Sequence, residues 1–335
     1  MKKMVIPSDF RRASPSASPV YRRFNLRLLF LGFAWIFVLE ILLAAYRNRW
    51  LPAGWPRDIG FVVGVHFTPW IWCGYLLVLG GVIGLLDGSA WVLKFRHRLL
   101  ALWLWSVPAW CYFDWLNFQF MRDPATGLHA WEYQGLDAGV VDRFLGYLLA
   151  FAAIAPGLML TAEVWRRVGM GRVHSRGVRI PKAIEIASVV LGALFFSGPF
   201  FLHEPIANLM IWVSLIFLLD PINHWCGRPS LMADWRAGRW GRTLSLMLGG
   251  LTCGFLWEFW NYWAVAKWTY HLPFLGTWQR IRYFAMPVPG LIGYFGFGLE
   301  MWVMWQFSLL LLGPLVEAGK PLTSCDIHAY EYECI

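Results

Sequence analysis

The sequence has little charge and carries none of the common catalytic signatures. Only 15% of its 335 residues are Asp, Glu, Lys or Arg, whereas a soluble globular domain carries about a quarter. It has no Walker phosphate loop, no HExxH zinc motif, no nucleophile elbow and no dinucleotide-binding glycine fingerprint. The low charge argues against a soluble domain, and the missing motifs leave no support for the enzyme classes that they mark.

Cysteine is also scarce, and its distribution shows no secreted disulfide framework. Cys73, Cys111 and Cys253 lie inside apolar stretches, where we expect them to pack as small hydrophobic side chains. Near the C-terminus, Cys325, His328 and Cys334 offer three soft ligands at irregular spacing, one fewer than a structural zinc site needs. We therefore predict no metal site and no cofactor.

Apolar and aromatic residues make up most of the chain. Hydrophobic residues make up 58% of the chain, which has a mean hydropathy of +0.50, and Trp alone contributes 23 residues. Long apolar stretches alternate with short basic clusters, which is the pattern of a polytopic integral membrane protein. We predict a location in the bacterial inner membrane.

The net charge of +9 does not indicate a nucleic-acid partner. The basic residues lie in the connections between apolar stretches, where topology and contact with anionic lipid account for them. Membrane lipid is therefore the expected partner.

The apolar stretches predict an all-α bundle of about eight transmembrane helices, because about 20 apolar residues cross the hydrocarbon layer. The second and eighth are long enough to require a tilt or a proline kink. The predicted spans cover residues 26–45, 60–86, 99–120, 143–165, 184–202, 205–222, 243–264 and 286–313.

The distribution of Lys and Arg predicts that both chain ends are cytoplasmic. With the N-terminus inside, the cytoplasmic segments hold 20 Lys and Arg residues and the outer segments hold 8. Such an excess follows the positive-inside rule. We expect residues 1–25 to form a disordered cytoplasmic arm and residues 314–335 to form a cytoplasmic tail.

Recurring motifs predict two tandem four-helix repeats, residues 26–183 and 184–313. The segment FDWLNF around Asp114 resembles WEFWNY around Glu258, and each contains an acid followed three residues later by Asn. Further pairs follow in the same order at a constant offset: Trp131 with Trp268, Tyr133 with Tyr270, Glu163 with Glu300, and Trp165 with Trp302. Repeats of four spans enter the membrane in the same direction, so we expect a pseudo-two-fold axis along the membrane normal.

The embedded acids are the candidate catalytic residues. Asp114 and Glu258 each fall about 15 residues into a predicted helix, which places both in the outer half of the bilayer. A carboxyl group is costly in hydrocarbon and should face a partner, water or the bundle interior. We predict Glu258, Asp114 and Glu300 as catalytic candidates.

Amides and aromatic rings near these acids are the candidate substrate-binding residues. We select Asn117, Asn261, Trp257, Trp268 and Tyr270. The alternative interpretation is structural: acid-x-x-Asn pairs can hydrogen-bond helices together, and the aromatic residues can form an interfacial belt.

The second predicted repeat resembles uncharacterised duplicated bacterial membrane proteins. The similarity lies in residues 243–305, in the segments WEFWN, KWTYHLP and MPVPGLIGYFGFGLE. More distantly, this region is similar to the membrane lycopene cyclase and carotenoid hydratase group. That resemblance implies acid-initiated chemistry on polyenes. The cyclase group has paired glutamates soon after a proline, whereas here Pro287 and Pro289 precede Gly290 and the nearest acid is Glu300.

Three functions follow from these patterns. The first is an intramembrane enzyme or binder for an isoprenoid, carotenoid-like or other apolar lipid, with an apolar small molecule as ligand. The alternatives are an ion-coupled transporter and a non-catalytic subunit of a larger membrane complex. The sequence indicates no oligomeric state.

Overall fold

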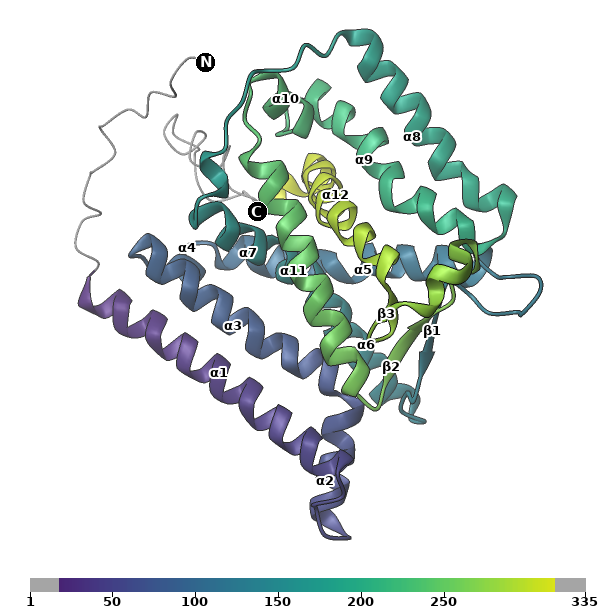
Figure 1. The fold of residues 1–335 in the computed structure, drawn as a ribbon. Helices are drawn as coiled ribbons and strands as arrows, with labels where there is room; N and C mark the ends of the chain where they lie inside the picture. Colours follow the sequence, from purple (N-terminus) through teal and green to yellow (C-terminus); the bar gives the residue numbers. More distant parts are fainter. Residues whose placement is uncertain (1–17, 317–335) are drawn as a thin grey trace.

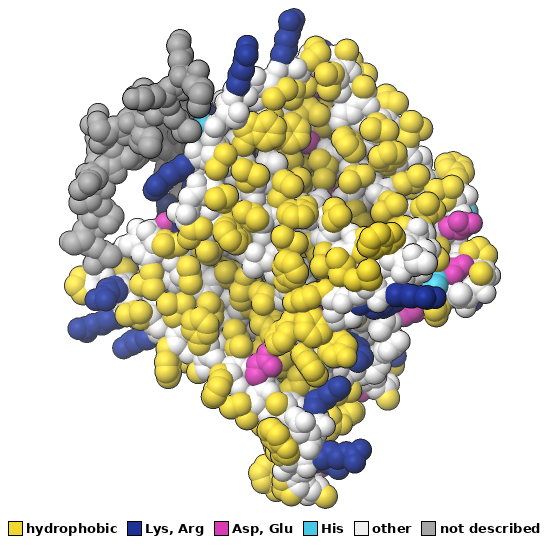
Figure 2. Space-filling model, in the orientation of Figure 1, with side chains coloured by type: hydrophobic (Ala, Val, Ile, Leu, Met, Phe, Trp, Pro, Cys, Tyr) yellow, Lys and Arg dark blue, Asp and Glu magenta, His cyan; other side chains and the backbone are white. Residues whose placement is uncertain are grey.

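The computed structural model describes residues 18–316 and shows an all-α protein. Six of its helical segments are long and apolar enough to cross a membrane. They are Pro19–Arg47, Phe67–Asp87, Val140–Arg167, Lys182–Leu202, Pro205–Trp225 and Val288–Gly313. Six helices of this length and composition are typical of a membrane protein. Hydrophobic side chains cover the middle of the face in Figure 2, and Lys and Arg lie mainly toward its edges.

Each of the eight predicted spans overlaps a helix or a pair of helices. The spans expected at 99–120 and 243–264 correspond to α5 (Arg96–Phe120) and α11 (Gly241–Trp263). At 1.5 Å per residue these helices are about 37 and 35 Å long, enough to cross the hydrocarbon layer. Helices α5 and α11 are not among the six apolar segments, because their C-terminal halves carry Trp, Tyr, Asn and the acids Asp114 and Glu258. Eight spans therefore remain a prediction.

The remaining long helices pack side by side in two groups (Figure 1). In the first group α1 packs on α3, and α3 packs on α7; in the second α8 packs on α9, and α9 packs on α12. Helix α11 joins the groups by contacting both α7 and α12. The bounds are α1 Pro19–Arg47, α3 Phe67–Asp87, α7 Ile154–Arg167, α8 Lys182–Leu202, α9 Asn208–Trp225 and α12 Gly293–Val316.

Short elements connect these helices. The helical ones are α2 (Trp55–Val65), α4 (Trp91–Lys94), α6 (Val140–Ala152), α10 (Leu231–Arg236) and the 3-10 turns η1 (Met170–Arg172), η2 (Pro205–Ala207), η3 (Pro273–Arg280) and η4 (Val288–Ile292). The strands form two antiparallel pairs: β1 (Trp131–Gln134) with β2 (Lys267–Tyr270), and β3 (Arg282–Tyr283) with β4 (Met286–Pro287). The strand pairs follow the helices that carry Asp114 and Glu258, at the end of the bundle predicted to be outside.

Several predicted boundaries differ from the observed ones. Helix α1 begins at Pro19, so residues 19–25, which we assigned to the arm, belong to the first helix. A proline at the first helical position is favourable, because its missing N–H would have had no partner there. The last predicted span begins as β4 and η4, so α12 starts only at Gly293. The rest of the arm and most of the tail, including Cys325, His328 and Cys334, lie outside the described residues.

A serine explains the break between α6 and α7. Ser106 on α5 donates its hydroxyl hydrogen to the carbonyl of Phe151 (2.5 Å) and accepts the N–H of Ala155 (2.9 Å). In an uninterrupted helix those two backbone groups would bond to each other. The inserted side chain satisfies both groups, and such insertions bend helices. The bend turns α6 relative to α7 beside the cavity described below.

Helices α11 and α12 approach closely because glycines line their contact. A Cβ atom at Gly250 would lie 2.0 Å from the backbone oxygen of Tyr294, and one at Gly298 would lie 2.2 Å from that of Leu246. Small residues allow such approach in membrane bundles, where dispersion contacts hold helices together. The contact matters for the site because Glu258 lies on α11 and Tyr294 lies on α12.

We predict that Gly250→Ala destabilises the protein by about 1–3 kcal/mol, because the helices must separate to admit the methyl group. Thermal unfolding in mild detergent measures the effect. The matched control is Gly293→Ala, because a Cβ at Gly293 meets no atom within 4 Å. Equal melting temperatures for the two variants would contradict the close α11–α12 contact.

Candidate functional site

The two-stranded β1–β2 ladder joins the two halves of the chain. Trp131 pairs with Tyr270, and Tyr133 pairs with Trp268. Alternate residues of a strand point to the same side, so these four aromatic side chains share one face of the ladder. All four line a single cavity beneath it. The Trp-x-Tyr motifs recognised in the sequence therefore lie next to each other.

Two buried asparagines hold the ladder to the helices. The Asn117 amide donates to the carbonyl of Trp131 (2.9 Å), and its side-chain oxygen accepts the N–H of the same residue (3.3 Å). Asn261 makes the same two bonds to Trp268, both at 2.8 Å. Each asparagine side chain thus binds both backbone groups of one strand residue, as a residue of a neighbouring strand would do. These bonds make Asn117 and Asn261 positioning residues, because they contact backbone and are absent from the cavity lining.

Asp114 receives its hydrogen bonds from the aromatic residues of β1. The Trp131 indole N–H donates to Asp114 Oδ1 (2.9 Å), and the Tyr133 hydroxyl donates from 3.0 Å to the same oxygen. The Trp110 indole in turn donates to the Tyr133 hydroxyl (3.2 Å). The carboxyl group therefore lies behind the rings that face the cavity.

Glu258 occupies the corresponding place behind β2. Its Oε1 accepts from the hydroxyls of Tyr270 (2.8 Å) and Tyr294 (2.6 Å). The Trp268 indole donates to the Tyr270 hydroxyl (2.7 Å). Burial, reinforced by the nearby Glu258 carboxylate, raises the pKa of Tyr270 well above its usual range. The Tyr270 hydroxyl therefore keeps its proton and remains a donor.

Neither acid contacts a Lys, Arg or His side chain within residues 18–316. Glu258 is fully buried, and its second oxygen, Oε2, makes no hydrogen bond of ordinary geometry among the described residues. The backbone N–H of Met286 nevertheless lies close enough to act on the carboxyl group. The Oε2 atom is therefore the less tightly held of the two carboxyl oxygens.

The cavity under the ladder has a volume of about 810 Å³ and an almost wholly apolar lining. Its walls come from α3, α5, α6, α9, α10, α11, α12 and the segments around β1 and β2, and many of the lining side chains are aromatic. The tryptophans and tyrosines are Trp72, Trp110, Trp131, Trp212, Trp235, Trp257, Trp268, Tyr133, Tyr147, Tyr270 and Tyr294.

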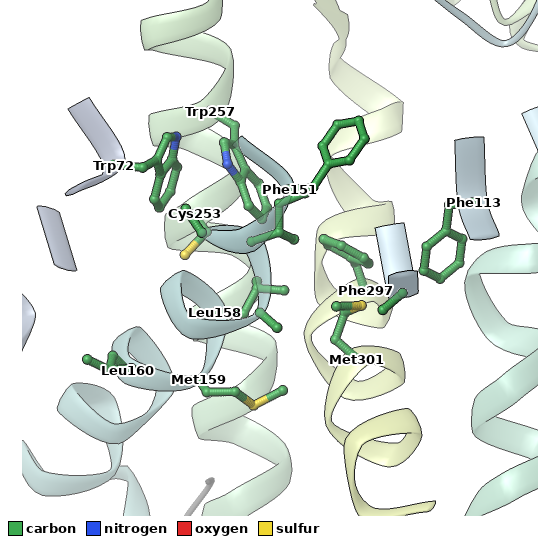
Figure 3. Close-up of a cluster of buried hydrophobic side chains, with 14 of the residues drawn as sticks. Trp72, Phe113, Phe151, Leu158, Met159, Leu160, Cys253, Trp257, Phe297 and Met301 are labelled. Atoms are coloured by element: carbon green, nitrogen blue, oxygen red, sulfur yellow. The ribbon is translucent and has the colours of Figure 1, made fainter. Parts of the chain in front are cut away.

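Trp257 belongs to the packed aromatic wall of this cavity. Its ring centroid lies 5.1 Å from Trp72 and 5.8 Å from Phe297, and Figure 3 shows Trp257 beside Trp72. Such tilted arrangements are favourable between aromatic rings. Trp257, predicted as a binding residue, does face the cavity.

Glu300, the third predicted catalytic acid, lies elsewhere. Its Oε1 accepts the backbone N–H of Leu215 on α9 (3.1 Å), and it does not line the cavity. Glu300 therefore bridges α12 and α9. Its predicted repeat partner Glu163 differs again, because it forms ion pairs with Arg166 and Arg167.

Sequence reasoning missed Tyr294, which completes the Glu258 cluster. Tyr294 lies on α12 within the segment GLIGYFGFGLE, and no counterpart marks it in the first half, where the matching position is Gly157. Trp110 and Trp212 were also missed, because a tryptophan-rich chain gives no signal for which rings face inward. Their ring centroids lie 6.5 Å apart across the cavity wall.

Outside the cavity, an acid–histidine pair connects the loop after α5 to the segment after β2. Asp123 Oδ2 lies 2.6 Å from His271 Nε2 and also accepts from the Thr126 hydroxyl (2.8 Å). The backbone N–H of His271 donates to the carbonyl of Ala130 (3.0 Å). The hydrogen bond from His271, helped by that from the Ala125 N–H, lowers the pKa of Asp123 to about 2.

This lowered pKa predicts an acid-sensitive loop contact. A depressed folded-state pKa stabilises the fold above the unfolded value of about 3.9, and the contribution is lost as the pH falls toward the folded value. We expect Asp123→Asn to lower the melting temperature in detergent at pH 5 but to have little effect near pH 2. A pH-independent difference from wild type would contradict this. Asp58→Asn, at an exposed acid in α2, is the control.

Comparison of the chain with protein-family models, curated proteins and solved structures finds no match. Within residues 18–316, no group of three or more His, Cys, Asp or Glu side chains is arranged to hold a metal ion. The functional interpretation therefore depends on the geometry of the cavity and its two carboxyl clusters.

Proposed function

We propose that this protein binds an apolar, isoprenoid-like membrane lipid in the cavity beneath the β1–β2 ladder. The observation that supports this most is one aromatic cavity of about 810 Å³ bordered by two tyrosine–carboxyl clusters. Ligand sites have volumes of roughly 300–1,000 Å³, mostly apolar walls and a few well-placed polar groups. An apolar lipid with one small polar end matches this combination.

The aromatic walls favour an unsaturated or polyene chain. Rings of Trp and Tyr offer flat, polarisable surfaces that pack well on planar segments and attract positive charge. The hydroxyls of Tyr133 and Tyr270 mark the polar end, where the carboxyl groups hold them in place. A lipid whose polar group lies under the ladder would bury its chain among the rings.

We predict that a hydrophobic molecule co-purifies with the protein in mild detergent and can be identified by mass spectrometry. Trp257→Ala should reduce its recovery by roughly tenfold, because losing a buried aromatic anchor typically costs more than about 1 kcal/mol. Trp55→Ala is the control, since Trp55 is 74% exposed and does not line the cavity. Equal recovery from both variants would contradict binding at this site.

Acid-catalysed chemistry on the bound lipid is a second candidate function. The weakly held Oε2 of Glu258 and the Tyr270 hydroxyl beside the cavity favour it. A neutral carboxyl group can protonate a double bond as a general acid, aromatic faces can stabilise the resulting cation, and the same group can take a proton back. In this scheme Glu258 supplies the proton, either directly or by way of the Tyr270 hydroxyl that it contacts. Asp114 has the corresponding position beside Tyr133 in the first half.

Glu258→Gln separates binding from catalysis. If the protein is an enzyme, this variant should still retain the lipid while the product disappears from the lipid extract of an overproducing strain. Glu40→Gln is the matched control, because Glu40 lies on α1 and contacts the Trp260 indole (2.9 Å) rather than the cavity. An unchanged product profile in Glu258→Gln would leave only the binding function.

The proposed function includes a topology of eight spans with both ends cytoplasmic. Helices α5 and α11 would be the two spans whose polar groups face inward, and the two Asn-clamped strands would be matching parts of a tandem repeat. The identical bonding of Asn117 and Asn261 supports this. The excess of Lys and Arg in the predicted inner connections supports the orientation.

Cysteine labelling tests this orientation. In a chain whose native cysteines are replaced by alanine, Ala53→Cys lies in the α1–α2 connection and Ser175→Cys follows η1. Both positions are exposed. We expect a membrane-impermeant maleimide to label position 53, and not position 175, in intact spheroplasts. The reverse pattern would invert the topology.

A further inference from the structure

The cavity reaches the surface of the bundle in two chemically different places. Near the ladder its lining includes Asp142, Arg143 and Lys267, which form a charged mouth. On another side its lining includes two apolar residues that are also largely exposed: Leu209 at the start of α9 (54%) and Ile292 just before α12 (68%). An opening framed by exposed aliphatic side chains suits contact with hydrocarbon better than contact with water.

The apolar opening continues along the bundle as a groove. Leu209, Val213 and Phe217 on α9 line the same cavity as Phe295 and Leu299 on α12. From Leu209 to Phe217 the groove extends about 12 Å along the helix. Figure 1 shows α12 between α9 and α11, and α12 packs on both of these helices.

Glycines connect this groove to the aromatic chamber. Gly290, Gly293 and Gly296 all line the cavity at the start of α12. A Cβ atom at Gly293 would meet no atom within 4 Å, so the space beside it is open. The other two glycines lie closer to protein: a Cβ at Gly290 would lie 2.5 Å from Met286 Sδ, and one at Gly296 would lie 3.1 Å from the carbonyl oxygen of Trp212. Gly293 therefore marks the open point between the groove and the chamber.

The first half of the chain has no equivalent connection. At the predicted repeat offset of 137 the corresponding residues are Ala153, Pro156 and Met159. All three are buried in the packed core. The opening is therefore a feature of the second half alone, unlike the duplicated strands and asparagines.

We propose that the ligand enters from the bilayer through this lateral opening between α9 and α12. The ligand is then a membrane-resident lipid whose polar end reaches Tyr270 and Tyr294 while its chain stays in the α9–α12 groove. This inference rests on the proposed function, and it adds the route of entry and the lipid class. A water-soluble metabolite would instead use the charged mouth.

Two glycine variants distinguish these routes. Gly293→Leu places an isobutyl group in the lateral opening, at a position where the Cβ atom meets no other atom within 4 Å. Gly146→Leu places the same group at the charged mouth, where a Cβ would lie 3.6 Å from the His66 ring. Leu209→Trp is a second obstruction of the lateral opening, at a site outside the packed core.

The probe is retinol, an isoprenoid polyene alcohol that accepts excitation energy from tryptophan. Proteoliposomes are mixed with retinol-loaded vesicles, and the rise of energy transfer from tryptophan to retinol is followed. Exposed tryptophans such as Trp35 and Trp50 also transfer energy to retinol in the bilayer, so the rate of entry is taken from the part of the rise that Trp257→Ala removes. We expect Gly293→Leu and Leu209→Trp to slow this rate by about tenfold or more, and Gly146→Leu to leave it within about twofold of wild type. Parinaric acid, a linear polyene fatty acid, tests whether the site prefers an isoprenoid chain.

The outcomes separate the two proposals. Unchanged entry in Gly293→Leu and Leu209→Trp, with binding intact in the wild type, would overturn the lateral route and leave the proposed function standing. Slowing by Gly146→Leu alone would assign entry to the charged mouth. No energy transfer to either probe in the wild type would overturn the proposed function and the lateral route together.

Discussion

The architecture depends on satisfying two carboxyl groups inside an apolar helix bundle. Hydrocarbon offers them no water, and no cation contacts Asp114 or Glu258 among the described residues. Their hydrogen-bond donors must therefore come from nearby protein groups. The indole and hydroxyl groups of Trp131, Tyr133 and Tyr270 supply them from two short strands. The strands are in turn fixed by Asn117 and Asn261, so the acids, amides and ladder form one interdependent unit.

This unit also explains the cavity. The four aromatic rings on one face of the ladder lie beside the acids on α5 and α11, and the space below them is lined by further aromatic and aliphatic side chains. The bend that Ser106 introduces between α6 and α7 lies beside this space. The close α11–α12 contact at Gly250 brings Tyr294 to Glu258. The sequence left a structural and a functional interpretation open for these motifs. In the structure the asparagines bind backbone, and the tyrosines face the cavity.

Periodic and compositional signals predicted the helices well, because apolar length alone determines where a chain can cross a bilayer. The acid-x-x-Asn and Trp-x-Tyr motifs also identified residues that the structure brings together. Other features had no sequence signal. The ladder joins strands β1 and β2, which begin 136 positions apart in the chain. Trp131 can therefore pair with Tyr270 only after both halves have folded. Glu300, like Glu258, is an acid inside an apolar stretch, yet its hydrogen-bond partner is a backbone N–H of α9, which only packing determines.

The central claim is that the space under the ladder holds an apolar membrane lipid. Cryo-electron microscopy of the protein extracted directly into lipid nanodiscs from its native membrane tests this most directly. The account predicts elongated density that contacts Tyr270 and Tyr294 at one end and extends between α9 and α12 at the other. A cavity containing ordered water, or collapsed by inward movement of the aromatic rings, would contradict it.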